Sequence, residues 1–179
     1  MCSLLRPMTT RLKIFVQGIA WAALLATAAR AMPAGAPEAE GDYLRLGFNW
    51  LGAYKFVAPV FDPAADQKAT PPTGEEQIPA EVKAWNGRKA IVTGFMLPTK
   101  MANGLVTEFL LVKDPMMCCY GVVPNMNEWV VVHMGKGVKP LMDVPISFYG
   151  QLKVGAMFEN GYMTGIYLLE GEGEKGGKL

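Results

Sequence analysis

The chain has 179 residues, of which 51% are hydrophobic and 18% charged, and its formal net charge at pH 7 is +1. This length and hydrophobic content suffice for one domain with an ordinary core and exclude a disordered or collagen-like chain. Past the N-terminal region, the sequence has no uncharged run as long as a membrane span, which excludes a polytopic membrane protein.

The N-terminal region has the features of a cleavable signal peptide. Basic residues between Arg6 and Lys13 precede an apolar stretch at residues 14–29, and an Ala-x-Ala motif ends at Ala31. The apolar stretch is shorter than the roughly 20 residues of a membrane-spanning helix, and an uncleaved signal anchor is the alternative. We therefore expect residues 1–31 to be removed and the mature chain to be periplasmic, without a membrane span.

Removal of this peptide changes the charge balance. The peptide contains four of the 17 basic residues and none of the 16 acidic ones, so the mature chain has a formal charge of −3. A mildly acidic protein has no electrostatic reason to bind a phosphate backbone or anionic lipid. The sequence therefore predicts no nucleic-acid partner.

The mature chain is predicted to begin with a loosely structured arm at residues 32–77. This arm comprises a Pro/Ala-rich tail, an aromatic segment at Tyr43–Phe61 and a polar linker in which Pro71-Pro72 forbids a helix. The aromatic side chains dock either onto the domain or, if left exposed, onto a partner. We favour docking onto the domain, because exposed aromatic patches are rare.

Residues 78–170 have the regular signals of a β domain. A short helical turn is expected near Pro79, with Gly87 in a left-handed cap after it. Asn103-Gly104 and Asn160-Gly161 predict tight hairpin turns. Five runs rich in β-branched and aromatic residues are predicted as strands. They are Lys89–Leu97, Leu105–Lys113, Glu128–Met134, Val144–Val154 and Tyr162–Leu169.

Five strands without helical spacers predict one antiparallel sheet. Gly94 and Gly150 interrupt two strand patterns, and such glycines mark bulges or strong coiling that lets a short sheet close on itself. We predict a mainly β protein: a small five-stranded antiparallel barrel of the OB type at residues 78–170, with no helix longer than about three turns. An open meander covered by the aromatic segment is the alternative. Residues 171–179 are predicted to form a flexible tail.

A loop with two adjacent cysteines separates the second predicted strand from the third. Its motif is Cys118-Cys119-Tyr120-Gly121, followed by Pro124 and Asn125 and then by Glu128-Trp129-Val130-Val131-Val132. Further matching residues are Ile78-Pro79, Asn86-Gly87-Arg88, Gly94-Phe95-Met96-Leu97-Pro98, Phe109-Leu110-Leu111-Val112, Val144-Pro145-Ile146, Gly150 and Ile166-Tyr167-Leu168. In these residues the chain resembles a bacterial exported family, domain-of-unknown-function family 3299. The resemblance implies export and a small β-barrel-like domain, and it brings no catalytic role.

The adjacent cysteines are candidate metal ligands. Cys118, Cys119 and the only histidine, His133, supply thiolate and imidazole groups that suit copper or zinc. Nearby methionines at 116, 117, 126 and 134 add thioethers, which suit cuprous copper. Against a metal, adjacent cysteines chelate one tetrahedral ion less easily than a spaced pair, and methionine is a common core filler.

Two other uses of the cysteine pair stay open. A vicinal disulfide is strained and readily reduced, which suits a redox switch. Alternatively, a disulfide or buried thiols hold the long loop in place, which is the interpretation that we favour. In either case we expect Cys118 and Cys119 to lie near His133, because a loop between adjacent strands folds back near its own hairpin.

The sequence favours a non-enzymatic function. It contains neither an H-E-x-x-H nor a G-x-S-x-G motif. We expect an exported binding or assembly module that contacts another envelope protein or a small ligand, with Tyr120, Asn125 and Trp129 as candidate surface residues. The alternative is a periplasmic metal-binding (copper or zinc) or thiol-redox protein that uses Cys118, Cys119 and His133.

Overall fold

The computed structural model describes residues 33, 35–59, 72–115 and 124–176, and in this part of the chain the protein is mainly β. The elements are, in chain order, β1 (Ala39–Glu40), β2 (Tyr43–Arg45), α1 (Phe48–Leu51), η1 (Glu75–Gln77), α2 (Ala80–Lys83), β3 (Lys89–Ala102), β4 (Leu105–Val112), β5 (Trp129–Val138), β6 (Ile146–Glu159) and β7 (Tyr162–Gly176). The described helices are single turns, as expected. None of them has the length and apolar character that crossing a membrane requires.

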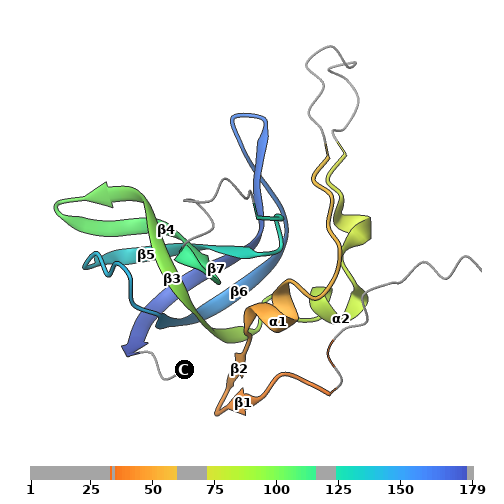
Figure 1. The fold of residues 1–179 in the computed structure, drawn as a ribbon, viewed down its shortest axis with the longest axis horizontal. Coiled ribbons are helices and arrows are strands. Elements are labelled where there is room, and N and C mark those ends of the chain that lie inside the picture. Colours follow the sequence, from red (N-terminus) through yellow and green to blue (C-terminus); the bar gives the residue numbers. More distant parts are fainter. Residues whose placement is uncertain (1–32, 34, 60–71, 116–123, 177–179) are drawn as a thin grey trace, which may run out of the picture.

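Five strands form a closed ring (Figure 1). The sheet order is β1-β2-β3-β4-β5-β7-β6, and β3 also pairs with β6, so the last strand of the order returns to the third. The five predicted strands are all present in the ring, but β3, β5, β6 and β7 extend 4 to 7 residues further than predicted, and β1 and β2 make the sheet seven-stranded. Within the ring, β6, β3, β4 and β5 are neighbours in that order, which is the Greek-key arrangement.

The prediction that the whole sheet is antiparallel is wrong. β5 pairs with β7 in the parallel direction, with Val131 opposite Leu168 and Met134 opposite Gly171. β2 also pairs in parallel with β3. A Greek key places the fourth strand beside the first, so the fifth strand closes the ring against the third, and both of these run the same way. The sheet is mixed for this topological reason.

The turns confirm the hairpin predictions. Asn103 and Gly104 have φ of 52° and 78° between β3 and β4, and Asn160 and Gly161 have φ of 53° and 84° between β6 and β7. Both residues of such a turn need positive φ, which Asn and Gly tolerate best. Gly87 has φ of 77° after α2, as the predicted left-handed cap requires.

Two boundary predictions need correction. Residues 171–176 are not a flexible tail, because they continue β7 and pair with β6 as far as Gly176 opposite Ile146. The arm is not loosely structured over its aromatic part: β2 joins the sheet beside β3, and Leu46, Leu51 and Phe56 are each at most 2% exposed. The docked interpretation of the aromatic segment is therefore confirmed for residues 43–59.

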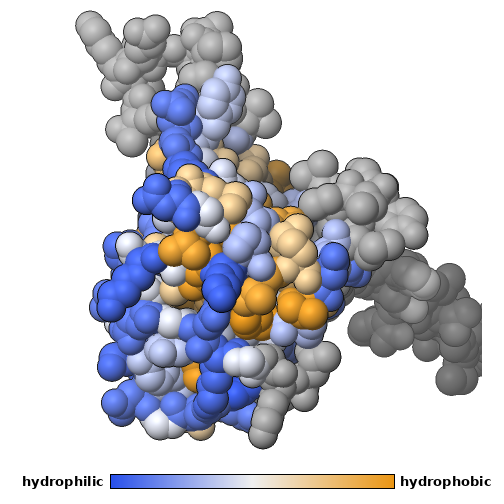
Figure 2. All heavy atoms as spheres, turned by 90° about the vertical axis from the view of Figure 1, so that its left-hand side faces the viewer, coloured by the Kyte–Doolittle hydropathy of each residue, from blue (hydrophilic) through white to orange (hydrophobic). Residues whose placement is uncertain are grey.

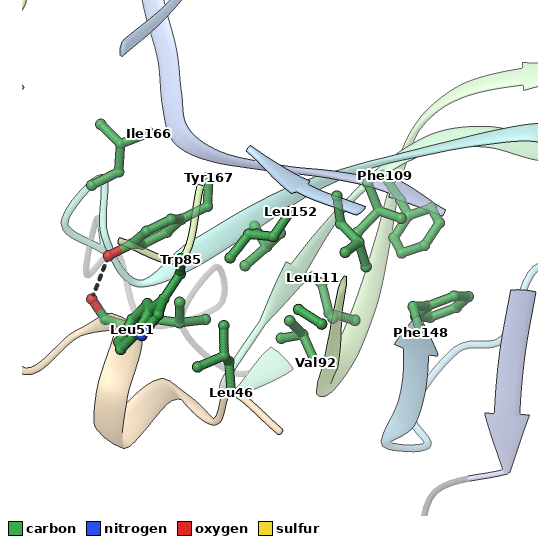
Figure 3. Packing of buried hydrophobic residues seen from close by; sticks show 14 of the residues in the cluster. Leu46, Leu51, Trp85, Val92, Phe109, Leu111, Phe148, Leu152, Ile166 and Tyr167 are labelled. Carbon is green, nitrogen blue, oxygen red and sulfur yellow. Dashed lines mark hydrogen bonds between the residues drawn. The ribbon is translucent and has the colours of Figure 1, made fainter. Parts of the chain in front are cut away.

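The core fills the ring and extends under the docked arm. It combines inward side chains of the ring strands with side chains of α1, α2 and their flanks. Figure 1 shows both short helices on the same side of the ring, away from the β3–β4 hairpin. Figure 3 shows Leu46, Leu51 and Trp85 from this side packed among side chains of the ring such as Val92, Leu111 and Leu152.

Candidate functional site: the outer face of the ring

Apolar side chains form rows on the outside of the ring. The strand register places Leu97 opposite Leu110, Leu110 opposite Val131 and Val131 opposite Leu168. Directly opposed residues in a sheet have side chains on the same face. A second row, two residues along, contains Phe95, Val112 and Trp129. We call these seven residues the apolar patch.

The alternation of side chains proves that the patch faces outward. Neighbours in sequence, such as Phe109, Leu111, Val130 and Val132, are fully buried in the core of the ring. Successive strand residues point to opposite faces, so the patch residues point away from that core. Val131 and Val112 are buried although neither belongs to the core cluster, whereas Leu110 is only half-buried.

A row of ionisable side chains borders the apolar patch. The strand register aligns four of these side chains, two or three residues beyond the Leu110 row: Lys100 of β3, Glu108 of β4, His133 of β5 and Glu170 of β7. Glu108 Oε2 lies 3.0 Å from Lys100 Nζ, and Glu170 Oε1 lies 2.9 Å from Lys153 Nζ. We call these four residues, together with Lys153, the charged row.

Glu108 is the best-connected carboxylate of this row. Thr99 Oγ1 donates to its Oε1 at 2.9 Å, while Lys100 and His133 contact its Oε2. Burial alone would raise the pKa of Glu108, but the hydrogen bonds from Lys100 and Thr99 outweigh it and hold that pKa below its usual value. Glu108 is therefore held as a carboxylate.

His133 lies between two carboxylates, those of Glu108 and Glu170. Its Nε2 is 3.0 Å from Glu108 Oε2, and its Nδ1 is 3.8 Å from Glu170 Oε2. Both ring nitrogens of His133 therefore have a carboxylate neighbour. Among the residues that the structure describes, no group of three His, Cys, Asp or Glu side chains is arranged to hold a metal ion.

Of the other predicted site residues, the structure describes Asn125 and Trp129. Cys118, Cys119 and Tyr120 lie outside the described residues, so their predicted proximity to His133 stays a prediction. Asn125 forms a turn: both its backbone N–H and its Nδ2 donate to Glu128 Oε2, at 2.8 and 3.1 Å. Trp129 belongs to the apolar patch, and its Nε1 donates to Thr164 O at 3.1 Å.

Two hairpins flank the patch. Trp129 donates a hydrogen bond to Thr164 O in β7. The next residue, Gly165, packs against both patch residues, because a Cβ added there would lie 3.2 Å from Trp129 Nε1 and 3.3 Å from Val131 Cγ2. Lys100 Nζ in the β3–β4 hairpin is 3.2 Å from Glu159 Oε1 in the β6–β7 hairpin. The Lys100–Glu159 ion pair joins the two hairpins on the outer face, next to the charged row.

Large exposed hydrophobic side chains occur in these hairpins. Met101 near the first tip is 55% exposed, and Phe158 and Tyr162 at the second are 44% and 65% exposed. Met142 and Val144, in the connection between β5 and β6, are exposed as well. Figure 2 looks at the side of the ring with the β3–β4 hairpin, where hydrophobic side chains gather in the middle of a hydrophilic surround.

A second polar network lies on the opposite, buried side. The hydroxyls of Tyr54 and Tyr167 are 2.9 Å apart, and Tyr167 donates to Leu51 O at 3.0 Å (Figure 3). Asn127 Nδ2 donates to Tyr54 O at 2.6 Å, while its Oδ1 is buried without a partner among the described residues. Burial raises the pKa of Tyr54 to about 12, so this buried network is neutral.

The family model for "Protein of unknown function (DUF3299)" matches residues 57–173, which include β3 to β6 and β7 as far as Gly173. The chain belongs to the DUF3299 family. The resemblance seen in the sequence is thereby confirmed. Among solved structures, this DUF3299 chain is similar to a DUF3299 family protein from Pseudomonas aeruginosa PAO1. The two share 25% sequence identity at a TM-score of 0.53, and the match covers 78% of this chain and 99% of that chain. No curated protein matches the chain.

Sequence reasoning identified Trp129 and His133 but missed the rest of the outer face. Leu97, Leu110 and Leu168 are in strands that were predicted correctly, yet a continuous apolar run such as Phe109–Val112 does not reveal which residues face outward. One signal was available: a half-buried strand alternates apolar and polar residues, whereas these strands are apolar on both faces. That signal favours a covered or ligand-binding outer face.

Proposed function

We propose that this DUF3299 protein is an exported, periplasmic, non-enzymatic binding module with an OB-type barrel, and that it binds through the apolar patch. The observation that carries the proposal is the apolar character of the outward side of β4 and β5. Five of its seven side chains are half-buried and keep part of their apolar surface in water, which costs free energy, and a contiguous apolar patch of this kind is typical of an interaction site.

The strand order supports the OB-type assignment. An OB barrel is a five-stranded Greek-key barrel that binds ligands on its second and third strands and on the loops between strands one and two and between strands four and five. In this ring the second and third strands are β4 and β5, and those two loops are the β3–β4 and β6–β7 hairpins. The patch and its flanking hairpins therefore coincide with the usual binding face of that fold.

The polar groups of the face support binding over catalysis. Glu108, His133 and Glu170 are held in ion pairs and hydrogen bonds with one another or with lysines. The pKa of Glu108 is held below its usual value, which makes this carboxylate a weak general base near neutral pH. The arrangement of these groups suits a rim that fixes the position of a bound partner.

Export is tested first, by mass spectrometry of fractionated cells. The expected result is a periplasmic protein whose N-terminus lies at or within a few residues of Met32, because cleavage after Ala31 is predicted. An intact Met1 in the membrane fraction would contradict export. Elemental analysis of the same periplasmic protein tests the metal alternative: copper or zinc near one equivalent would favour it.

Binding is tested with a chemically diverse panel on the purified mature protein. The panel contains a random 12-residue peptide library, chitotetraose, a dT12 oligonucleotide and laurate. We expect at least one member to bind wild type, and to bind Leu110→Lys at least about tenfold more weakly, a loss typical of a central contact residue. Gln151→Lys is the matched control, because it adds the same charge at an exposed position of β6. If no member binds, or if both variants bind like wild type, the proposed function is wrong.

A further inference from the structure

We infer that the apolar patch takes an extended, uncharged apolar segment of a polypeptide. This inference rests on the proposed function and specifies the chemistry of its ligand. It follows from three features of the outer face: the charges beside the patch are already neutralised, the patch has no polar group to offer, and the side chains of the flanking hairpins are those of protein interfaces.

The charged row is balanced within itself. Lys100 is paired with Glu108 and Glu159, and Lys153 is paired with Glu170. An anionic ligand, such as a nucleic acid or a lipid headgroup, would have to compete with carboxylates for both lysines and would meet the like charge of Glu108 and Glu170. A ligand without net charge avoids this cost, so electrostatic complementarity favours it.

The patch itself offers no hydrogen bond to a polar ligand. Six of its seven side chains are hydrocarbon, and the only polar atom, Trp129 Nε1, is used by Thr164 O. A carbohydrate bound here would leave hydroxyl groups buried without partners, which costs about 1–3 kcal/mol each. An apolar side chain loses nothing by the same burial and gains the hydrophobic term.

The geometry and the flanks favour a polypeptide over a small apolar molecule. The Leu110 row and the Trp129 row lie two strand residues apart, and alternate side chains of an extended peptide are separated by the same roughly 7 Å. Met101, Phe158 and Tyr162 stand exposed in the two joined hairpins. Methionine and aromatic residues are enriched in protein interfaces, where they provide contact area.

The panel described above separates this inference from the proposed function. We expect the peptide library to yield sequences with alternating apolar residues and no net charge, and we expect chitotetraose, dT12 and laurate not to bind. The selected peptides should bind Leu110→Lys at least about tenfold more weakly than wild type, with Gln151→Lys unchanged.

A second variant guards against loss of folding in Leu110→Lys. Phe158→Ser with Tyr162→Ser changes two exposed side chains, so the ring keeps its core and the thermal unfolding midpoint should stay close to that of wild type. Binding of the selected peptides to this variant should still fall several-fold. If the peptides bind it like wild type, the role of the hairpins in the inference is overturned.

The remaining outcomes each have one meaning. Binding of chitotetraose, dT12 or laurate that is lost in Leu110→Lys would keep the proposed function and overturn the inference. Selection of strongly basic or acidic peptides would overturn it as well. If peptides bind only after residues 116–123 are replaced by a Gly/Ser linker, the occupant of the patch is that segment of the chain itself, and the inference is overturned. Failure of every member would overturn both proposals.

Discussion

The two polar networks of this protein differ in burial, and burial decides how much each network contributes to stability. The buried network joins Tyr54, Tyr167 and Leu51 O between the arm and the ring, and it is neutral. The charged row joins Lys100, Glu108 and their neighbours on the outer face, where most of its side chains are exposed. A buried polar group costs free energy when it loses its partner, whereas a solvated ion pair is worth little.

The comparison predicts where the chain tolerates change. Breaking the contacts of the docked arm should destabilise the fold, because those side chains leave a cavity or an unpartnered group. Changing the charged row should leave the fold nearly intact, because water replaces each lost interaction. Substitutions in the charged row should thus be tolerated, and substitutions in the buried arm contacts should not.

The largest expected effect comes from Leu51→Ala in α1. Leu51 is fully buried in the core, so the truncation leaves a cavity and should lower the free energy of unfolding by about 2–5 kcal/mol. Urea denaturation followed by far-UV circular dichroism measures this change. Asn49→Ala is the matched control in the same helix, because Asn49 is exposed, and its effect should stay within about 0.5 kcal/mol. A small effect of Leu51→Ala would mean that the arm does not belong to the cooperative unit.

An intermediate effect is expected from Tyr167→Phe. The change removes only the hydroxyl that donates to Leu51 O, and it leaves that buried carbonyl and the Tyr54 hydroxyl without their partner. The expected loss in free energy of unfolding is about 1–3 kcal/mol. Tyr43→Phe removes an equivalent hydroxyl from an exposed bond to Glu172, and urea unfolding should show a clearly smaller loss. Equal losses in the two variants would contradict the distinction between the networks.

The smallest expected effect comes from Glu108→Gln in the charged row. At pH 7 the loss of unfolding free energy should be about 1 kcal/mol or less, because most of its partners are exposed. The pKa of Glu108 is lowered by folding, so its contribution is present above the unfolded-state value, near 4.3, and is lost as the pH falls through the folded value. The difference between wild type and variant should therefore shrink on acidification.

Urea unfolding of wild type and Glu108→Gln between pH 7 and pH 3 measures this dependence. Glu81→Gln is the matched control, because the same change is made at an exposed carboxylate of α2. Its difference from wild type should stay near zero at every pH. A difference for Glu108→Gln that does not vary with pH would show that the ion pairs of the charged row contribute nothing to stability.

Local chemistry was sufficient to predict much of the fold. The strand positions follow from runs of β-branched and aromatic residues, and the two hairpins follow from Asn-Gly pairs that accept positive φ. The resemblance to the DUF3299 family follows from residues that include the motif around Cys118 and Asn125, and the family model confirms it over residues 57–173. Each of these properties depends on neighbours in sequence, so a single sequence contains the information.

The tertiary structure alone decided how the strands meet. The parallel closure of β5 on β7 depends on contacts between residues more than thirty positions apart, such as Val131 and Leu168, and no local pattern specifies such a partner. The same closure turns Gly171–Gly176 from an apparent tail into a paired strand. The pairing of β3, β4 and β5 places Leu97, Leu110 and Val131 side by side outside the ring, and the closure on β7 adds Glu170 beside His133, which lies between Glu108 and Glu170. The sequence of a strand that is apolar on both faces does not reveal which residues point outward. The pairing register decides this, because a slip of one residue would exchange the two faces.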